Sequence, residues 1–203
     1  MTPTTRARLR RTATAVLTVA TTALLWACQP PSDTVTVVGD SLTMTTLLDG
    51  QFPAAWDIHS MLGWQAEDAQ PGLTTRVNDA QRSPCAVTIA LGQNDAARHS
   101  DGRGDGWTTT DAAQMRQLRD TLHQDTRVLW VLPDYDGSDP AYAAGINAYR
   151  SWVTTYAAAR GDDVVDWRTR NTAADIDTDG VHLTPTGRQH YGAMITQEMP
   201  TCA

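Results

Sequence analysis

The sequence predicts a single-domain α/β fold in which helices cover both faces of a doubly wound parallel sheet, giving three α/β/α layers. Two observations predict it. Short, continuous apolar runs rich in Val, Leu and Ile are typical of strands that are buried on both faces, and segments with helical periodicity lie between these runs. About 175 residues follow the first 28, which is enough for one domain with a sizeable core.

The elements follow in a regular alternation along the chain. The predicted strands are three clear runs and two weaker ones: Thr34–Val38, Cys85–Leu91 and Arg127–Leu132, then Ala54–Ile58 and Asp163–Trp167. The predicted helices are Leu42–Leu48, Leu73–Gln81, Thr109–His123, Ala141–Ala159 and Thr184–Met199. The last helix has Pro185 near its first turn, where proline is tolerated. Ser100–Gly106, which is rich in Asp and Gly, is predicted to be a loop directly after a strand.

The first 28 residues are predicted to be an export signal rather than part of the fold. Four arginines precede an uncharged, largely apolar stretch that is too short and too rich in Thr for a comfortable membrane span. Leu25-Trp-Ala-Cys28 resembles the lipobox of bacterial lipoproteins, although a small residue is usual where Trp26 stands. We therefore expect a protein outside the cytoplasm with a lipid anchor on Cys28; plain secretion and an uncleaved anchor are the alternatives. Residues 29–33 are expected to form a short tether, and 34–203 the folded domain.

The charge of the chain excludes some partners. All 16 basic residues are Arg, and four of them lie in the export signal, which leaves 12 Arg against 23 Asp and Glu, a net charge of −11. Such a surface argues against binding to nucleic acid and against electrostatic docking on anionic lipid.

Two cysteines, Cys85 and Cys202, remain once Cys28 is set aside. An oxidising compartment favours a disulfide between them, which would tie the C-terminus to the start of a central strand. Two separate buried thiols are the alternative.

Polar or glycine residues follow four of the predicted strands at the points where the strands end. They are Ser41 in Gly39-Asp-Ser-Leu, Gly63 in Leu62-Gly-Trp, Asn94 in Gly92-Gln-Asn-Asp, and Asp179 and His182 in Asp-Gly-Val-His. The carboxyl ends of parallel strands meet at one edge of a sheet, where open α/β sheets bind their ligands. We therefore expect these residues to lie together.

The residue types at this edge match the demands of acyl transfer. A serine hydroxyl such as that of Ser41 needs a base, for which His182 is the candidate, and the base needs a carboxylate that fixes its tautomer, here Asp179. The oxyanion of the tetrahedral intermediate needs hydrogen-bond donors. The backbone N–H groups of Ser41 and Gly63 and the side-chain amide of Asn94 are the candidates.

These motifs resemble those of the SGNH hydrolases, the GDSL-type esterases and acyltransferases. Ser41, Asn94 and the pair Asp179 and His182 match three of the four family blocks in order, and Gly63 is the assignment for the loosely defined second block. The resemblance spans residues 34 to 199. It implies a flavodoxin-like fold and a serine esterase that uses no cofactor and no metal. Gln93 stands where the family commonly has Thr.

Each site residue also has a structural interpretation. Ser41 alone would be read as the N-cap of a helix, Asn94 as part of a turn, and Gly63 as a turn glycine. Residues 175–180 spell the opening of an EF-hand calcium loop, but such a loop needs Glu at its twelfth position, where the chain has Thr186. We therefore expect no calcium site.

The resemblance and the export signal together predict the function. We expect hydrolysis of short-chain acyl esters, with O-acetyl groups on cell-envelope glycans as candidate substrates, because the sequence shows no lid and no long apolar groove. The expected partners are a small-molecule or glycan ester and, if Cys28 is lipidated, the membrane. An envelope O-acyltransferase with the same triad and a non-catalytic glycan-binding lipoprotein on a hydrolase scaffold are the alternatives.

Overall fold

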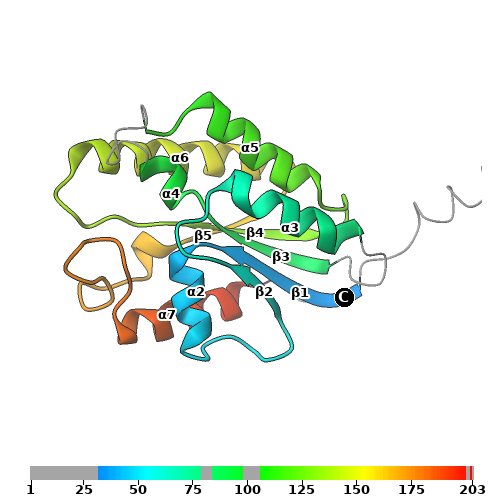
Figure 1. The fold of residues 1–203 in the computed structure, drawn as a ribbon, viewed down its shortest axis with the longest axis horizontal. Helices are drawn as coiled ribbons and strands as arrows, with labels where there is room; N and C mark the ends of the chain where they lie inside the picture. Colours follow the sequence, from blue (N-terminus) through cyan, green and yellow to red (C-terminus); the bar gives the residue numbers. More distant parts are fainter. Residues whose placement is uncertain (1–31, 79–83, 98–105, 200–201, 203) are drawn as a thin grey trace, which may run out of the picture. The chain divides into compact units, whose positions relative to one another are not determined.

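A computed structural model describes residues 32–78, 84–97, 106–199 and 202. Its strands form one parallel sheet in the order β2-β1-β3-β4-β5 (Figure 1). The strands are β1 (Ser32–Gly39), β2 (Asp57–Ser60), β3 (Pro84–Ala90), β4 (Arg127–Leu132) and β5 (Asp163–Asp166). The helices are α2 (Ser41–Leu48), α3 (Ala66–Asn78), α4 (Gln93–Ala96), α5 (Thr109–Asp120), α6 (Pro140–Arg160), the short 3-10 helix η2 (Trp167–Thr169) and α7 (Pro185–Glu198).

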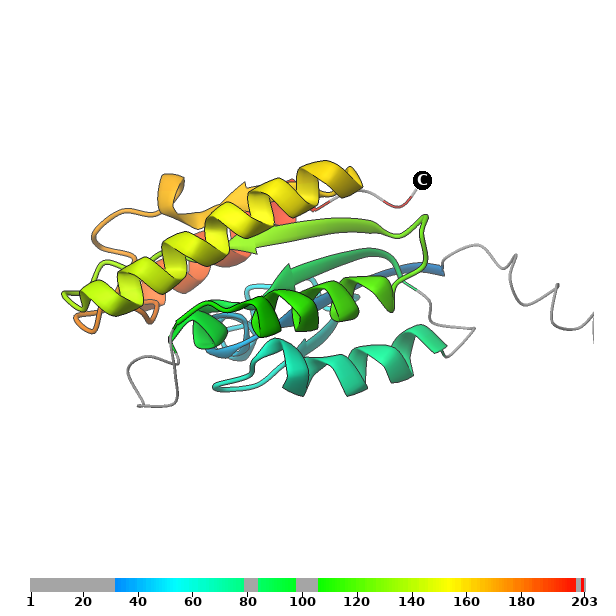
Figure 2. The ribbon, with the colours of Figure 1, turned by 90° about the horizontal axis from the view of Figure 1, so that it is seen from above.

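The sheet is doubly wound, as the sequence predicts. The chain leaves β1 toward β2 on one side and returns to β3 on the other, so the strand order reverses between β1 and β3. Helices α2 and α7 cover one face of the sheet, and α3, α5 and α6 cover the other (Figures 1 and 2). Ligands of such sheets bind at the carboxyl ends of the strands that flank the reversal.

Two apolar clusters hold the layers together. On one face, Leu73 of α3, Tyr149 of α6 and Trp130 of β4 belong to one buried cluster. On the other face, Leu42 of α2 and Ile195 of α7 belong to a second buried cluster, which also contains the β4 side chains that point to this face. Burial of a strand on both faces requires apolar side chains at successive positions, which is why the sequence of β4 is a continuous apolar run.

Several helices begin after a residue whose side chain accepts hydrogen bonds from the free N–H groups of the first turn. Thr108 and Asp111 form a capping box at the start of α5. Asp139 caps α6, and Thr184 caps α7; each cap is followed by a proline at the first helical position. These are the favoured residues at such positions.

The starts of three elements differ from the prediction by two or more residues. Strand β1 begins at Ser32, so the last two residues of the expected tether belong to the sheet. Helix α3 begins at Ala66 rather than Leu73 and contains Pro71; the N–H of Ala66, at its start, donates to Oδ1 of Asp95 at 3.2 Å. Strand β2 lies at Asp57–Ser60, so it starts three residues and ends two residues later than predicted. It is a partly exposed edge strand, so it carries little apolar signal.

The N-terminal predictions lie outside the described residues. These are the export signal, Cys28 and residues 29–31, and the predicted loop 100–106 is described only at its last residue. Within the described part of the chain, no helix has both the length and the apolar composition needed to cross a membrane.

Candidate active site

Ser41 is the first residue of α2 and directly follows β1. The turn between the two is tight: a Cβ at Gly39 would lie 2.0 Å from Oγ1 of Thr43, so only glycine fits there. Asp40 is the N-cap of the helix, and its Oδ1 accepts a hydrogen bond from the N–H of Leu42 at 3.1 Å. The cap of this helix is therefore Asp40, which leaves the hydroxyl of Ser41 free of that task.

Asp179 and His182 are brought together in the loop between η2 and α7. Oδ2 of Asp179 lies 2.6 Å from Nδ1 of His182. Its Oδ1 accepts hydrogen bonds from the backbone N–H groups of Val181 and His182, both at 2.9 Å. Partial burial opposes ionisation of Asp179, but these hydrogen bonds outweigh it and lower the pKa of the carboxyl. A charged carboxylate at Nδ1 leaves Nε2 as the nitrogen that can accept a proton.

The same loop lies at the end of the sheet where α2 begins (Figure 1). Two observations connect His182 with the serine. Burial raises the pKa of Asp40, the residue before Ser41, and the charge of His182 opposes this rise, so the ring lies close enough to act on that carboxyl. Helix α7, which starts three residues after His182, packs on α2, with Gly192 against Thr46. Among the described residues, no hydrogen bond joins the Ser41 hydroxyl to the His182 ring, a contact that in ester hydrolases often tightens only with substrate bound.

Asn94, in α4, connects the loops that follow β1 and β2. Its Nδ2 donates to the backbone carbonyl of Trp64 at 3.0 Å and lies 3.5 Å from Oδ2 of Asp40. The second contact is at the outer limit for a hydrogen bond, so one amide hydrogen remains available to a third acceptor. Asn94 thus lies between the segment that carries Ser41 and the turn that carries Gly63.

Gly63 occupies a turn with φ +73°, and nothing lies within 4 Å of the position of a Cβ there. The backbone conformation alone accounts for a glycine. Within the described residues, no group accepts a hydrogen bond from its N–H. Both interpretations of Gly63, turn residue and oxyanion donor, are therefore compatible with the structure.

Asp40 and Asp95 are buried carboxyls at this edge that sequence reasoning did not assign to the site. Burial, followed by the nearby charge of Asp95, raises the pKa of Asp40 to about 7, against the opposing effects of the Leu42 N–H and of His182. Asp95 holds the start of α3 through Ala66. The signal for Asp40 was present in Gly-Asp-Ser, where the aspartate precedes the first helical residue.

The carboxylates of the EF-hand-like segment have other partners. Asp175 contacts Thr172 and His190, and Asp179 contacts His182. In the part of the chain that the structure describes, no three His, Cys, Asp or Glu side chains are arranged to hold a metal ion.

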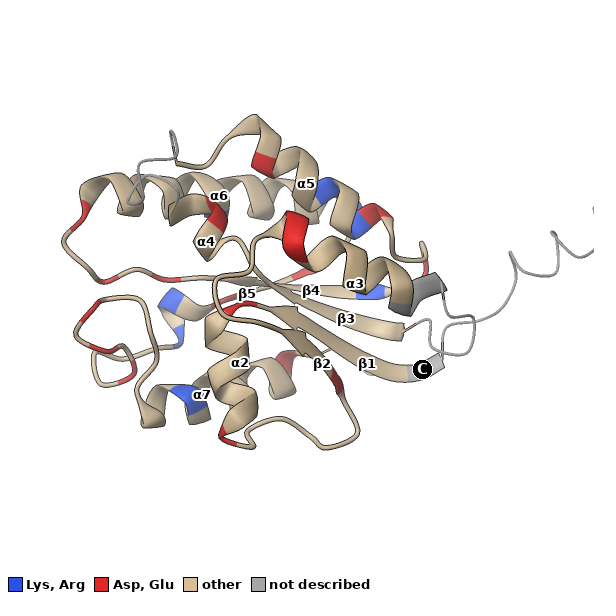
Figure 3. Ribbon diagram, viewed as in Figure 1, with Lys and Arg blue, Asp and Glu red and all other residues tan. Residues whose placement is uncertain are grey.

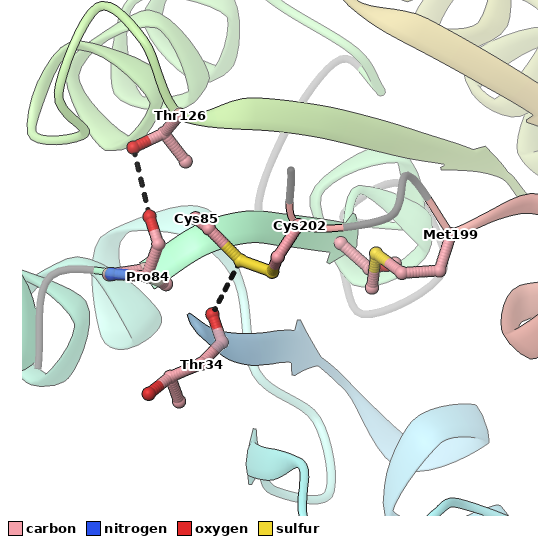
Figure 4. Close-up of a disulfide and its surroundings, with 7 residues drawn as sticks. Thr34, Pro84, Cys85, Thr126, Met199 and Cys202 are labelled. Carbon is pink, nitrogen blue, oxygen red and sulfur yellow. Dashed lines mark hydrogen bonds between the residues drawn. A yellow bond between two sulfur atoms is a disulfide. The ribbon is translucent and has the colours of Figure 1, made fainter. Parts of the chain in front are cut away.

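Cys85 and Cys202 lie side by side at the opposite, amino-terminal edge of the sheet. Their Cα atoms are 5.7 Å apart, and their sulfur atoms are joined (Figure 4). Cys85 is the second residue of β3, and its Sγ lies 3.4 Å from the carbonyl oxygen of Thr34 in β1. The predicted pairing is therefore geometrically available.

The sequence matches the model of one protein family. The model of the GDSL-like lipase/acylhydrolase family matches residues 37–190. Comparison with curated proteins finds no match.

Solved structures share the fold. The catalytic domain of peptidoglycan O-acetyltransferase A from Streptococcus pneumoniae superposes with a TM-score of 0.65 at 17% identity, over 86% of this chain and 99% of that chain. A GDSL-like lipase from Bacteroides thetaiotaomicron gives 0.63 at 18%, over 86% and 93%. An acetylxylan esterase from Geobacillus stearothermophilus gives 0.59 at 16%, over 84% and 95%.

Proposed function

Because this chain belongs to the GDSL-like lipase/acylhydrolase family, we propose that it is a serine esterase that hydrolyses short-chain acyl esters through an acyl-enzyme on Ser41. One observation carries the proposal. The Asp179–His182 pair, with its 2.6 Å contact, lies at the edge of the sheet where α2 begins. Asp40 caps this helix, so the hydroxyl of Ser41 is not needed for capping.

The reaction divides into two acyl transfers. His182 takes the proton of the Ser41 hydroxyl at Nε2 while Oγ attacks the ester carbonyl, and Asp179 stabilises the imidazolium that forms. The imidazolium then gives this proton to the leaving alcohol as the C–O bond breaks. Water, deprotonated by the same ring, attacks the acyl-enzyme and releases the acid and the serine.

The oxyanion of each tetrahedral intermediate is the main charge to be stabilised. The amide of Asn94 and the backbone N–H groups of Gly63 and Ser41 are the proposed donors. The start of α2 adds the positive end of its helix dipole. None of these steps requires a metal or an organic cofactor.

We propose acetyl esters on cell-envelope glycans as the substrate class. The predicted export signal would deliver the protein to the envelope, with Cys28 as the proposed lipid attachment site. Proteins of the same fold include a peptidoglycan O-acetyltransferase and an acetylxylan esterase, whose names both link an acetyl group with a glycan. Acidic residues on the loops between β4 and α6 and between β5 and α7 (Figure 3) favour a substrate without negative charge.

In an oxidising envelope we also propose that Cys85 and Cys202 form a disulfide. It would fasten the C-terminal residues to β3 at the edge remote from the active site. The bridge would therefore stabilise the fold without entering the chemistry.

An O-acyltransferase is the second candidate, which the shared fold of a peptidoglycan O-acetyltransferase supports. The side chain of His182 is 51% exposed, which leaves access for a sugar hydroxyl as the acceptor. A purely glycan-binding role is the third candidate. The intact set of Ser41, Asp179 and His182 argues against it.

Hydrolysis of p-nitrophenyl acetate tests the esterase proposal. Wild type should release p-nitrophenol, and Ser41→Ala should reduce the rate to near background while remaining folded. Ser151→Ala, an exposed serine of α6, is the matched control and should retain the wild-type rate. Equal rates for wild type and Ser41→Ala would refute the nucleophile assignment. Mass spectrometry of products formed in the presence of a chitooligosaccharide acceptor separates transfer from hydrolysis.

A further inference from the structure

Two of the three catalytic side chains of the proposed mechanism stand on a loop, residues 171–184. Its tip is held by a hydrogen bond from the N–H of Asp136 to the carbonyl oxygen of Gly180 at 3.0 Å and by Val181, which packs against the core. The side chains of Asp179 and His182 are each about half exposed. The loop is closed by an antiparallel bridge between Ile176 and Leu183, and the N–H of Asp177 donates to the carbonyl of His182 at 2.7 Å. The position of the imidazole depends on these contacts of the tip and also on what fixes the base of the loop.

Asp175 lies at that base, and its side chain is fully buried. Its Oδ2 accepts hydrogen bonds from the backbone N–H of Thr172 at 2.7 Å and from its hydroxyl at 2.9 Å. Its Oδ1 lies 2.9 Å from Nδ1 of His190 in α7. Its backbone carbonyl accepts from the N–H of Thr184 at 3.0 Å. One residue thus joins both ends of the loop to each other and to α7.

The contact between loop and helix is close on the backbone side as well. A Cβ at Gly187 would lie 2.0 Å from the carbonyl oxygen of Asp175, so α7 can approach this far only because residue 187 is glycine. Burial opposes ionisation of Asp175, but the contacts with Thr172 and His190 lower the pKa of its carboxyl. A buried carboxylate that loses a partner carries a large desolvation cost, so the pair is sensitive to substitution.

We propose that Asp175 and His190 are a positioning pair for the esterase reaction: their contact holds the loop 171–184 against α7, and so holds the imidazole of His182 where it can take the proton of Ser41. This inference rests on the proposed function. Neither residue touches the substrate or the reacting atoms. Because α7 also packs on α2, the pair connects the segment that carries the base with the helix that carries the nucleophile.

Substitution of His190 separates this role from a general loss of stability. His190→Leu removes the partner of Asp175 and should lower kcat for p-nitrophenyl acetate roughly ten- to hundredfold with KM unchanged, as expected for a small displacement of a catalytic group. His190→Asn places an amide nitrogen near the position of Nδ1 and should restore most of kcat. Glu198→Gln is the matched control: it removes the exposed ion pair with Arg170 at the other end of α7 and should leave kcat unchanged.

Amide hydrogen exchange followed by mass spectrometry supplies a readout that does not need activity. Peptides covering residues 176–184 should exchange faster in His190→Leu than in wild type or Glu198→Gln, while peptides from β3 and β4 should not change. Equal exchange in this loop, or a wild-type kcat in His190→Leu, would overturn the positioning role. A fall in activity that only matches the loss of folded protein would do the same. If wild type shows no Ser41-dependent hydrolysis, the proposed function fails, whereas the exchange comparison still decides whether the pair holds the loop.

Discussion

Oδ2 of Asp40 lies 3.5 Å from Nδ2 of Asn94, which connects the residue before the nucleophile with the proposed oxyanion donor. The same amide nitrogen donates to the carbonyl of Trp64 beside Gly63. Three separate strand ends are therefore joined through one side chain. The position of the Asn94 side chain thus brings short motifs that are far apart in the sequence next to one another.

Replacement of Asn94 tests its part in stabilising the oxyanion. Asn94→Ala should lower kcat about 100- to 1000-fold with a smaller effect on KM, because the donor acts mainly in the transition state. Asn147→Ala removes an exposed amide outside the site and should leave kcat at the wild-type value. Steady-state kinetics with p-nitrophenyl acetate measures both. A change confined to KM would contradict the oxyanion role.

Replacement of Asp179 tests its part in orienting the base. Asp179→Asn should lower kcat roughly 1000- to 10,000-fold, because an amide at this position no longer favours the tautomer with the free Nε2. Asp177→Asn changes an exposed carboxylate two residues away and should have little effect. If Asp179→Asn were as active as Asp177→Asn, Asp179 would have no part in the mechanism.

Asp40 should make the stability of the protein depend on pH. Its pKa is raised from 3.8 to about 7 because the carboxyl is buried, so the folded state binds a proton that the unfolded state has lost between these values. Stability from this group is therefore present below about pH 4, falls as the pH rises, and is lost above about pH 7, a difference on the order of 4 kcal/mol.

Asp40→Asn does not titrate and should escape this loss. Urea unfolding at pH 5 and pH 8 should show that the advantage of Asp40→Asn over wild type grows with pH. The comparison between the two proteins cancels the contributions of other titrating groups. An advantage that is the same at both pH values would show that Asp40 is ionised throughout.

The Cys85–Cys202 pair should contribute to stability but not to catalysis. Cys202→Ser should lower the free energy of unfolding by about 2–5 kcal/mol relative to oxidised wild type, because the bridge closes a long loop. Reductant should lower the Tm of wild type and leave that of Cys202→Ser unchanged. Two reactive thiols in denatured, unreduced protein from an exported preparation would exclude the bridge.

The sequence predicted the sheet well wherever strands are buried on both faces. Arg127–Leu132 was predicted and observed without change, since a central strand must be apolar at successive positions. The edge strand β2 and the first turns of α3 were misplaced. Their stability comes from contacts with distant residues, such as that of Asp95 with Ala66, and such contacts leave no periodic pattern.

The family assignment and the ester-hydrolase expectation are confirmed by the match over residues 37–190. The motif residues could be predicted because each follows a strand, and parallel strands end at one edge. The contact of Asp40 with Asn94 and the role of Asp175 at the base of the loop could not be predicted. They depend on Asn94 and His190, partners that only the tertiary fold brings near.

The most direct test of the central claim is to locate the residue that a fluorophosphonate probe modifies and to compare the rates of modification. Peptide mapping by mass spectrometry should find the adduct on Ser41 in wild type, and His182→Ala should react far more slowly. An adduct on another residue, or equal rates in the two proteins, would contradict the assignment of Ser41 as a nucleophile activated by His182.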